Sequence, residues 1–148
     1  MKALISHNSD VSEVKDKKGK TILHLACQNG HLDVVNGLDD LLYPEQLSNI
    51  YELCDKEGNT LLHLACRYQR ENVIRHLIDN KGANIDARNN SMGNEAPIHI
   101  AAQFQSKKII NVLLEKGAGI ESRDANGCTP LHHAARCNQK DMVEHLKR

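Results

Sequence analysis

The sequence Thr60-Leu61-Leu62-His63 decides the fold, because three other strings in the chain repeat its pattern. The histidines that end the four strings are spaced 39, 36 and 33 residues apart. Repetition at such a period is the signature of a solenoid built from one supersecondary unit. The other strings are Thr21-Ile22-Leu23-His24, Ala96-Pro97-Ile98-His99 and Thr129-Pro130-Leu131-His132, and the small pairs that follow the four are Ala26-Cys27, Ala65-Cys66, Ala101-Ala102 and Ala134-Ala135.

Each string also carries the signals that begin a helix. Thr21, Thr60 and Thr129 stand where a side-chain oxygen would accept the free N–H groups of a first helical turn. Pro97 and Pro130 fall at the first helical position, where a missing N–H costs nothing. A second apolar set with i, i+3, i+4 spacing then predicts one face of a second helix. These sets are Val34, Val35 and Leu38; Val73, Ile74, Leu77 and Ile78; Ile109, Ile110, Leu113 and Leu114; and Met142, Val143 and Leu146.

Turn signals separate these helix pairs. Gly82 and Gly117 are predicted to end second helices with a left-handed cap. The strings Asp16-Lys17-Lys18-Gly19, Asp55-Lys56-Glu57-Gly58 and Asp124-Ala125-Asn126-Gly127 are typical of turns at the tips of projecting hairpins.

The phase and composition of these strings resemble the ankyrin repeat, whose signature is T-P-L-H-x-A with a period of about 33 residues. The resemblance covers residues 4–148 and implies an all-α solenoid of stacked helix-turn-helix units with projecting β-hairpin tips. We expect one domain over 1–148, with a partial N-terminal cap at 1–15 and repeats at about 16–54, 55–88, 89–123 and 124–148. Both ends look cut inside a repeat, so the chain is either a fragment or a small protein with abbreviated caps.

Three features depart from the repeat pattern. About six extra residues separate Leu38 from Asp55, and Pro44 can open a short extra helix there. The third tip, 89–95, is two residues longer than the fourth. Ala96 replaces the capping threonine, and loss of this cap lowers the stability of the helix by about 1 kcal/mol.

Composition excludes several classes of function. The formal net charge is zero, which argues against nucleic-acid binding and against a polybasic membrane surface, since both need a basic face. No stretch approaches the ~18 apolar residues of a membrane span. The five cysteines are odd in number and scattered, which favours the reducing cytoplasm or nucleus over an oxidising compartment.

No catalytic chemistry stands apart from the repeats, so we expect no enzyme, no cofactor and no small-molecule substrate. Gly19-Lys20-Thr21 lacks the earlier glycine of a P-loop, because Val14 occupies that position. Cys128, His132, His133 and Cys137 contain no Cys-x-x-Cys pair, and His132 is committed to the scaffold, so zinc is not expected. We predict that His133 and His145 lie at the surface or between helices.

The resemblance implies that a protein partner binds the concave face formed by the tips and first helices. Two interpretations of Tyr68 and Phe104 stay open: they form the centre of that face with Arg67 and Arg136, or Phe104 packs under the long third tip and Tyr68 packs on it. Aromatic residues and arginine are enriched at interface hot spots. The candidate partner-binding residues are Lys17, Lys18, Lys20, Lys56, Glu57, Asn59, Arg67, Tyr68, Met92, Asn94, Gln103, Phe104 and Arg136.

Within the family, the pattern is similar to inhibitor-of-kappa-B proteins. Leu23-His24-Leu25-Ala26-Cys27 is followed by an enlarged connection, and a later hairpin is lengthened, as in that subgroup. The similarity implies a Rel-type transcription factor as partner. An ankyrin-bearing bacterial effector and a fragment of a larger scaffold or channel protein are the alternatives.

Overall fold

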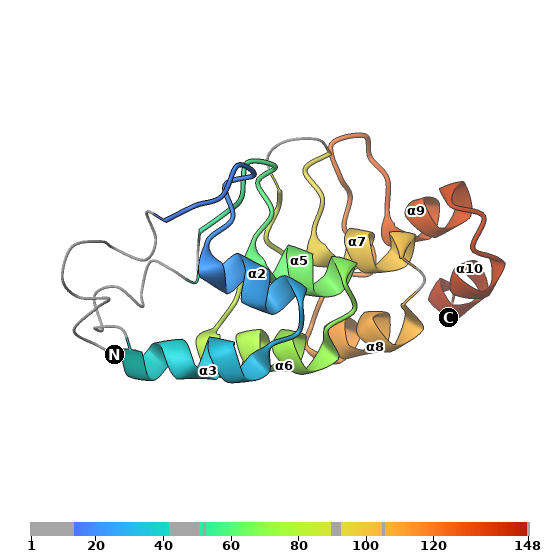
Figure 1. Ribbon diagram of the computed structural model, residues 1–148. Helices are drawn as coiled ribbons and strands as arrows, with labels where there is room; N and C mark the ends of the chain where they lie inside the picture. Colours follow the sequence, from blue (N-terminus) through green and yellow to red (C-terminus); the bar gives the residue numbers. More distant parts are fainter. Residues whose placement is uncertain (1–13, 42–50, 52, 90–92, 105, 148) are drawn as a thin grey trace.

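The computed structural model describes residues 14–41, 51, 53–89, 93–104 and 106–147. Within these residues the chain forms helices in consecutive pairs, and each predicted repeat segment contains one pair (Figure 1). The pairs are α2 (Ile22–Gln28) with α3 (Leu32–Leu41), α5 (Leu61–Arg67) with α6 (Glu71–Lys81), α7 (Pro97–Gln103) with α8 (Lys107–Glu115), and α9 (Pro130–Arg136) with α10 (Lys140–Leu146).

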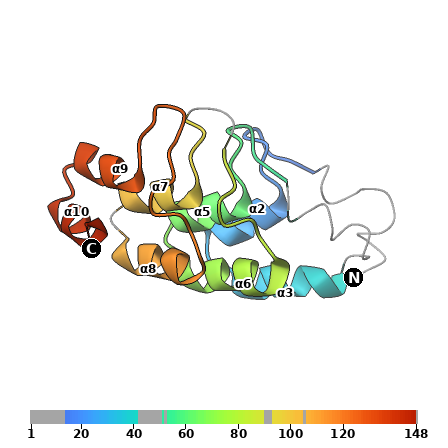
Figure 2. The same ribbon diagram turned by 180° about the vertical axis from the view of Figure 1, so that it is seen from behind.

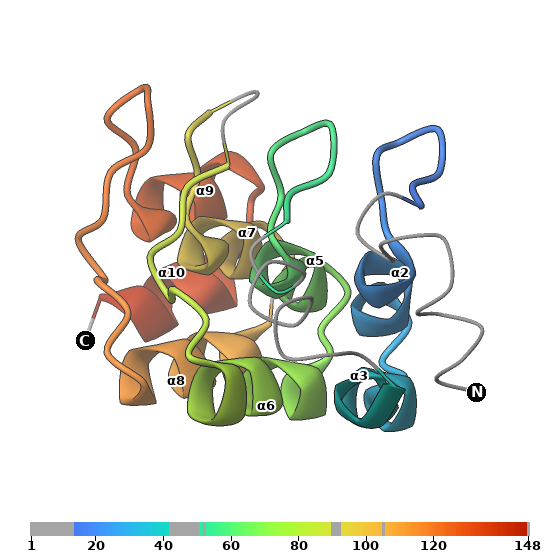
Figure 3. The same cartoon turned by 90° about the vertical axis from the view of Figure 1, so that its left-hand side faces the viewer.

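The helices form two layers. The first helices α2, α5, α7 and α9 stack on one another in chain order, and α3, α6 and α8 lie side by side beneath them (Figures 1 and 2). From the end of α8, the chain rises past the first-helix layer to a projecting tip before α9 begins, and the described parts of the tips stand in a row (Figure 3). The predicted all-α solenoid is therefore confirmed. Its tips are hairpin loops, and the described residues contain no β-strand.

The repeated histidine explains how successive pairs are locked together. In the second repeat, the N–H of Thr60 donates to Nδ1 of His63 at 3.2 Å, and the threonine hydroxyl accepts the N–H of His63 at 3.4 Å. The far nitrogen of the ring, Nε2, lies 2.7 Å from the carbonyl oxygen of Glu95 in the third repeat. The predicted threonine caps are thus confirmed, and their histidines also join neighbouring repeats.

The same double role recurs along the stack. Nε2 of His24 lies 3.0 Å from the carbonyl of Leu53, and Nε2 of His99 lies 2.9 Å from the carbonyl of Ser122. Because Nδ1 accepts a backbone N–H in each case, Nε2 carries the proton. Burial of the ring lowers the pKa of His24, His63 and His99, so these side chains stay neutral.

An aspartate closes each short tip. Oδ1 of Asp55 accepts the N–H groups of Glu57 and Asn59 at 3.0 and 2.9 Å, and Asp16 and Asp124 repeat this arrangement in their own tips. Gly58 follows with φ 77°, a left-handed conformation that glycine adopts without strain. The turn strings identified in the sequence therefore fold as predicted.

The core lies between the two layers and continues from pair to pair. Cys27 and Cys66 are fully buried in the positions of the small pairs, and burial raises the pKa of the Cys27 thiol to about 12. Gly82 caps α6 with φ 63°, as predicted. Pro97 and Pro130 begin α7 and α9. The expected extra helix at Pro44 lies outside the described residues, as does most of the predicted N-terminal cap.

Candidate protein-binding face

The surface that carries the predicted binding residues is formed by the tips and by the exposed sides of the first helices. We call this surface the inner face. Arg67 is the last residue of α5, and Tyr68 and Phe104 are the C-cap residues of α5 and α7. Each therefore stands where a first helix ends and the chain turns toward the second layer.

Arg67, Tyr68 and Phe104 form one cluster across two repeats. The Arg67 guanidinium carbon lies 5.9 Å from the centre of the Tyr68 ring and 5.6 Å from that of Phe104. The two aromatic residues remain 38% and 39% exposed. Exposed cation–π contacts contribute about 0.5–1 kcal/mol each, so Arg67 holds both rings in place without covering them. An arginine between two exposed aromatic rings has the composition of an interface hot spot.

Arg67 also separates two hollows on the inner face. The first hollow, of about 250 Å³, lies against the tips of the first two repeats and is bordered by Lys17, Lys18, Lys20, Lys56 and Tyr68, with Asp55, Glu57, Asn59, Leu64 and Arg67. The second hollow, of about 160 Å³, lies over α7 and is bordered by Ile100, Gln103 and Phe104, with Glu57, Asn59, Arg67, Asn89 and Glu95. The structure thus brings together ten of the thirteen candidate residues.

The lysines that border the first hollow differ in whether their ammonium groups already donate a hydrogen bond within the fold. Lys17, Lys18 and Lys56 are exposed, and the backbone N–H of Lys56 donates to the Lys18 carbonyl at 2.9 Å, which ties the first two tips together. The ammonium of Lys20 donates to Oε1 of Gln28 at 2.6 Å, so its side chain lies along α2.

Several candidate residues are already engaged in the scaffold. Asn59 is buried, and its amide bonds Asp55, Glu57 and Asn89. Nε2 of Gln103 donates to Oε2 of Glu95 at 2.8 Å. These contacts leave Asn59 and Gln103 with little capacity for a partner, although both line the hollows.

The remaining candidates lie apart from the two hollows. Asn94 has φ 52° and gives the longer third tip the left-handed turn that glycine supplies elsewhere. The guanidinium of Arg136 donates to Sγ of Cys128 at 3.2 Å, one repeat beyond Phe104. Met92 lies outside the described residues. The group that shares one location is therefore Arg67, Tyr68 and Phe104 with the lysines of the first hollow.

The sequence prediction for His133 left two alternatives, the surface or a position between helices, and the structure shows the second. His133 does not lie at the surface: it is 3% exposed, and its Nε2 lies 2.8 Å from Oδ2 of Asp124, whose side chain is 2% exposed. Its Nδ1 lies 2.9 Å from Nε2 of Gln103, so it does lie between helices, as the alternative prediction held. His145 likewise bridges helices, with Nε2 at 2.7 Å from Oδ1 of Asn111.

A sequence signal for this pair existed. His133 occupies the position of Leu25, Leu64 and Ile100 in the other repeats, and a polar residue at an apolar position requires a buried partner. Asp124 is that partner. Burial opposes ionisation of the carboxyl group, but hydrogen bonds from Cys128, His133 and Asn126 outweigh it and lower the pKa of Asp124.

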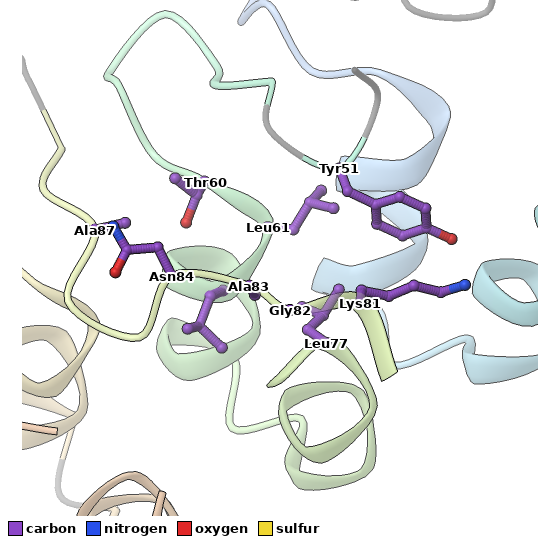
Figure 4. A pocket seen from close by; sticks show the side chains of 10 residues that line it. Tyr51, Thr60, Leu61, Leu77, Lys81, Gly82, Ala83, Asn84 and Ala87 are labelled. Atoms are coloured by element: carbon purple, nitrogen blue, oxygen red, sulfur yellow. The ribbon is translucent and has the colours of Figure 1, made fainter. Parts of the chain in front are cut away.

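A further cavity of about 390 Å³ lies where the start of α5 meets the end of α6 (Figure 4). None of the candidate binding residues lines it. Among the described residues that line it, the charged group is Lys81, whose ammonium lies 5.0 Å from the centre of the Tyr51 ring. No cluster of three or more potential metal ligands occurs in the described part of the chain. None of the helices described is long and apolar enough to cross a membrane.

Comparison with known proteins agrees with the architecture. The family model for ankyrin repeats in three copies matches residues 1–89 and 87–148. The chain belongs to the ankyrin-repeat family.

Three relatives that match most of the chain are longer proteins. The chain is 34% identical over 128 residues to a probable 26S proteasome regulatory subunit, p28, of Saccharomyces cerevisiae. The aligned region covers 86% of the chain and 53% of p28. It is 25% identical over 136 residues to the NF-kappa-B inhibitor cactus of Drosophila yakuba, covering 91% of the chain and 25% of cactus. It is 29% identical over 146 residues to an L-asparaginase of Dirofilaria immitis, covering 99% of the chain and 23% of that protein. The chain thus spans about half or less of each of these relatives.

Proposed function

We propose that the chain is a non-catalytic module that binds a partner protein on its inner face, with Arg67, Tyr68 and Phe104 at the centre of the contact. The observation that carries the proposal is the exposure of both rings beside a guanidinium, at the rim of two hollows. In a chain with a single Phe and three Tyr, exposure of two aromatic residues on one surface is better explained by binding than by packing.

The test compares the chain with the double variant Tyr68→Ala, Phe104→Ala in affinity capture from a cell lysate. Because both residues are partly exposed, truncation should leave the unfolding free energy within about 1 kcal/mol of the original. Loss of hot-spot side chains costs about 2 kcal/mol or more each, so captured proteins should fall at least tenfold. The measurements are quantitative mass spectrometry of the captured proteins and urea unfolding of both chains.

A matched control removes exposed apolar groups from elsewhere. Val34 of α3 is 46% exposed and Ile22 at the start of α2 is 41% exposed, and neither borders the two hollows. The variant Ile22→Ala, Val34→Ala should retain its partners. If it loses them equally, or if the Tyr68, Phe104 variant unfolds several kcal/mol more easily, the inner face is not the binding surface.

Two relatives suggest partners of different kinds, and both would place the chain in the cytoplasm or nucleus. Similarity to the NF-kappa-B inhibitor cactus supports a Rel-type transcription factor, which the enlarged connection between Leu38 and Asp55 also favours. The higher identity to p28 supports a component of a regulatory protease assembly. Pull-down with a purified Rel domain and with purified proteasome regulatory particle distinguishes the two. The first partner predicts that the chain binds only the Rel domain, and the second that it binds only the regulatory particle.

A further inference from the structure

Positive charge is unevenly distributed along the inner face. The first two tips carry Lys17, Lys18 and Lys56, and Lys20 follows the first of them. In the fourth tip, the exposed residues at the places of Lys17 and Lys18 are the neutral Ala125 and Asn126, and in the third tip Glu95 stands at the place of Lys20. The net charge of the whole chain is zero, so this asymmetry is a local feature of the first hollow.

Within the described residues, no carboxylate neutralises these tip lysines through an ion pair. The acidic groups of the same two tips are engaged in their own turns. Oδ1 of Asp16 accepts the N–H groups of Lys18 and Lys20, each at 2.9 Å. Asp55 serves its turn in the same way, and Oε2 of Glu57 accepts the amide of Asn59 at 3.3 Å.

Two lysines of the second-helix layer behave differently. The ammonium of Lys108 lies 2.9 Å from a carboxylate oxygen of Glu71, and that of Lys116 lies 2.7 Å from one of Asp79. Those charges are balanced within the fold, whereas the first hollow gathers several ammonium groups in one place and leaves them available to a partner.

The lining of this hollow is not only ionic. Leu64 and the exposed ring of Tyr68 border it beside the Arg67 guanidinium. An occupant that matches this lining has carboxylates for the lysine ammonium groups and an apolar or aromatic side chain for the ring of Tyr68. Charge complementarity of this kind accelerates association and selects partners.

We propose that the first hollow binds an acidic segment of the partner protein, with Asp or Glu side chains against Lys17, Lys18 and Lys56 and an apolar side chain against Tyr68. This inference rests on the proposed function and specifies the chemistry of its partner. A nucleic acid fits less well, because Glu57 borders both hollows and the second hollow adds Glu95. These carboxylates repel a phosphate backbone that continues past Arg67.

The experiment selects binders from a random peptide library with the full 148-residue chain. Selected peptides should be enriched in Asp and Glu around an apolar or aromatic residue. The variant Lys17→Gln, Lys18→Gln, Lys56→Gln should lose this enrichment, and a selected acidic peptide should bind it about tenfold more weakly. Raising the salt concentration should weaken binding to the original chain, because exposed charges are screened.

A charge-matched control separates location from net charge. Lys107, Lys140 and Lys147 are exposed and belong to the later helices or their ends, so Lys107→Gln, Lys140→Gln, Lys147→Gln should keep both the enrichment and the affinity. Peptides without acidic bias that still require Tyr68 and Phe104 would overturn this inference and leave the proposed function standing. If no selected peptide depends on any inner-face residue, both fail. Tighter binding of a single-stranded oligonucleotide, lost in the first lysine variant, would also overturn the inference.

Discussion

The inner face is built from one repeated unit, yet its two halves use their polar side chains in opposite ways. Over the first two repeats, the ammonium groups of the lysines around the first hollow form no ion pair within the described residues. Over the last two, Glu95, Gln103, His133 and Asp124 form a chain of contacts at 2.8–2.9 Å. The carbonyl of Gln103 also accepts a hydrogen bond from the amide of Gln139. The first half can therefore offer charge to a partner, whereas the second half uses its polar groups to join α7 to α9.

The difference comes from single positions within the repeat. Where three repeats place Leu25, Leu64 and Ile100, the last repeat places His133. Its ring packs edge-on against His99, with 5.1 Å between ring centres. A solenoid tolerates such exchanges because each repeat contacts only its neighbours, so specificity at one end and cohesion at the other can vary independently.

The largest effect is expected from His133→Ala. Removing the ring leaves Oδ2 of the buried Asp124 carboxylate without its side-chain partner, while Oδ1 keeps the N–H groups of Asn126 and Cys128. Breaking a buried pair from one side costs about 3–5 kcal/mol. We expect the unfolding free energy from urea titration to fall by about 3 kcal/mol. His145→Ala, which removes a partly exposed ring on α10, should cost less than about 1 kcal/mol.

A double variant sharpens this test. The substitution Asp124→Asn keeps an oxygen for the tip N–H groups, so combining it with His133→Leu removes the charge and restores the leucine found at this position in the first two repeats. Replacing both members of a buried pair is often close to neutral, so this variant should recover most of the lost stability. If His133→Ala instead costs no more than His145→Ala, water reaches Asp124 freely and the two halves of the face do not differ in this way.

The fold could be predicted almost entirely from the sequence, because caps, small pairs and apolar periodicity are local and recur in phase. Thr21, Thr60, Pro97 and Gly82 each carry a structural requirement that any copy of the repeat shares. Their agreement across the copies fixes the architecture.

The binding face could be predicted only in part. The phase of the repeat places Arg67, Tyr68 and Phe104 on one ridge, but it does not reveal that one guanidinium contacts both rings. It also gives no indication that Gln103 is bound by Glu95 and His133, because these contacts join repeats whose separation and tilt only the folded stack defines. Side chains that bridge repeats are therefore the ones whose roles the sequence predicts least well.

The second expected effect is a loss of stability in mild acid. Burial lowers the folded-state pKa of His24, His63 and His99 below the unfolded value of about 6.5. Below about pH 6.5 the unfolded chain therefore binds more protons than the folded chain, which favours unfolding. Their contribution to stability is complete above about pH 6.5 and declines as the pH falls toward the folded pKa values.

Urea unfolding at a series of pH values between about 7.5 and 5 measures this decline. The variant His63→Gln removes one of the three groups and should depend less steeply on pH, although it is less stable at neutral pH. A stability that is constant or rises as the pH falls through this window would contradict the buried, neutral state of these rings.

The smallest effect concerns the caps, where the third repeat differs from the other three. Ala96 has φ −84° and ψ 163°, close to the −80° and 174° of Thr60, and its N–H donates to Nδ1 of His99 at 3.0 Å. Only the hydroxyl that would accept the N–H of His99 is missing. Thr60→Ala should therefore cost about 1 kcal/mol, and Ala96→Thr should gain up to about 1 kcal/mol.

Ala96→Val provides the matched control, since valine has the shape of threonine without its hydroxyl. Both larger side chains must fit where Ala96 is fully buried, so the difference between them isolates the hydrogen bond from the packing. We expect the threonine variant to unfold at higher urea concentration than the valine variant. Equal midpoints would mean that the alanine cap loses no stability. The reason would be that His99 is already held by the residues that lead into the fourth repeat: its Nε2 lies 2.9 Å from the carbonyl of Ser122 and 3.0 Å from that of Cys128.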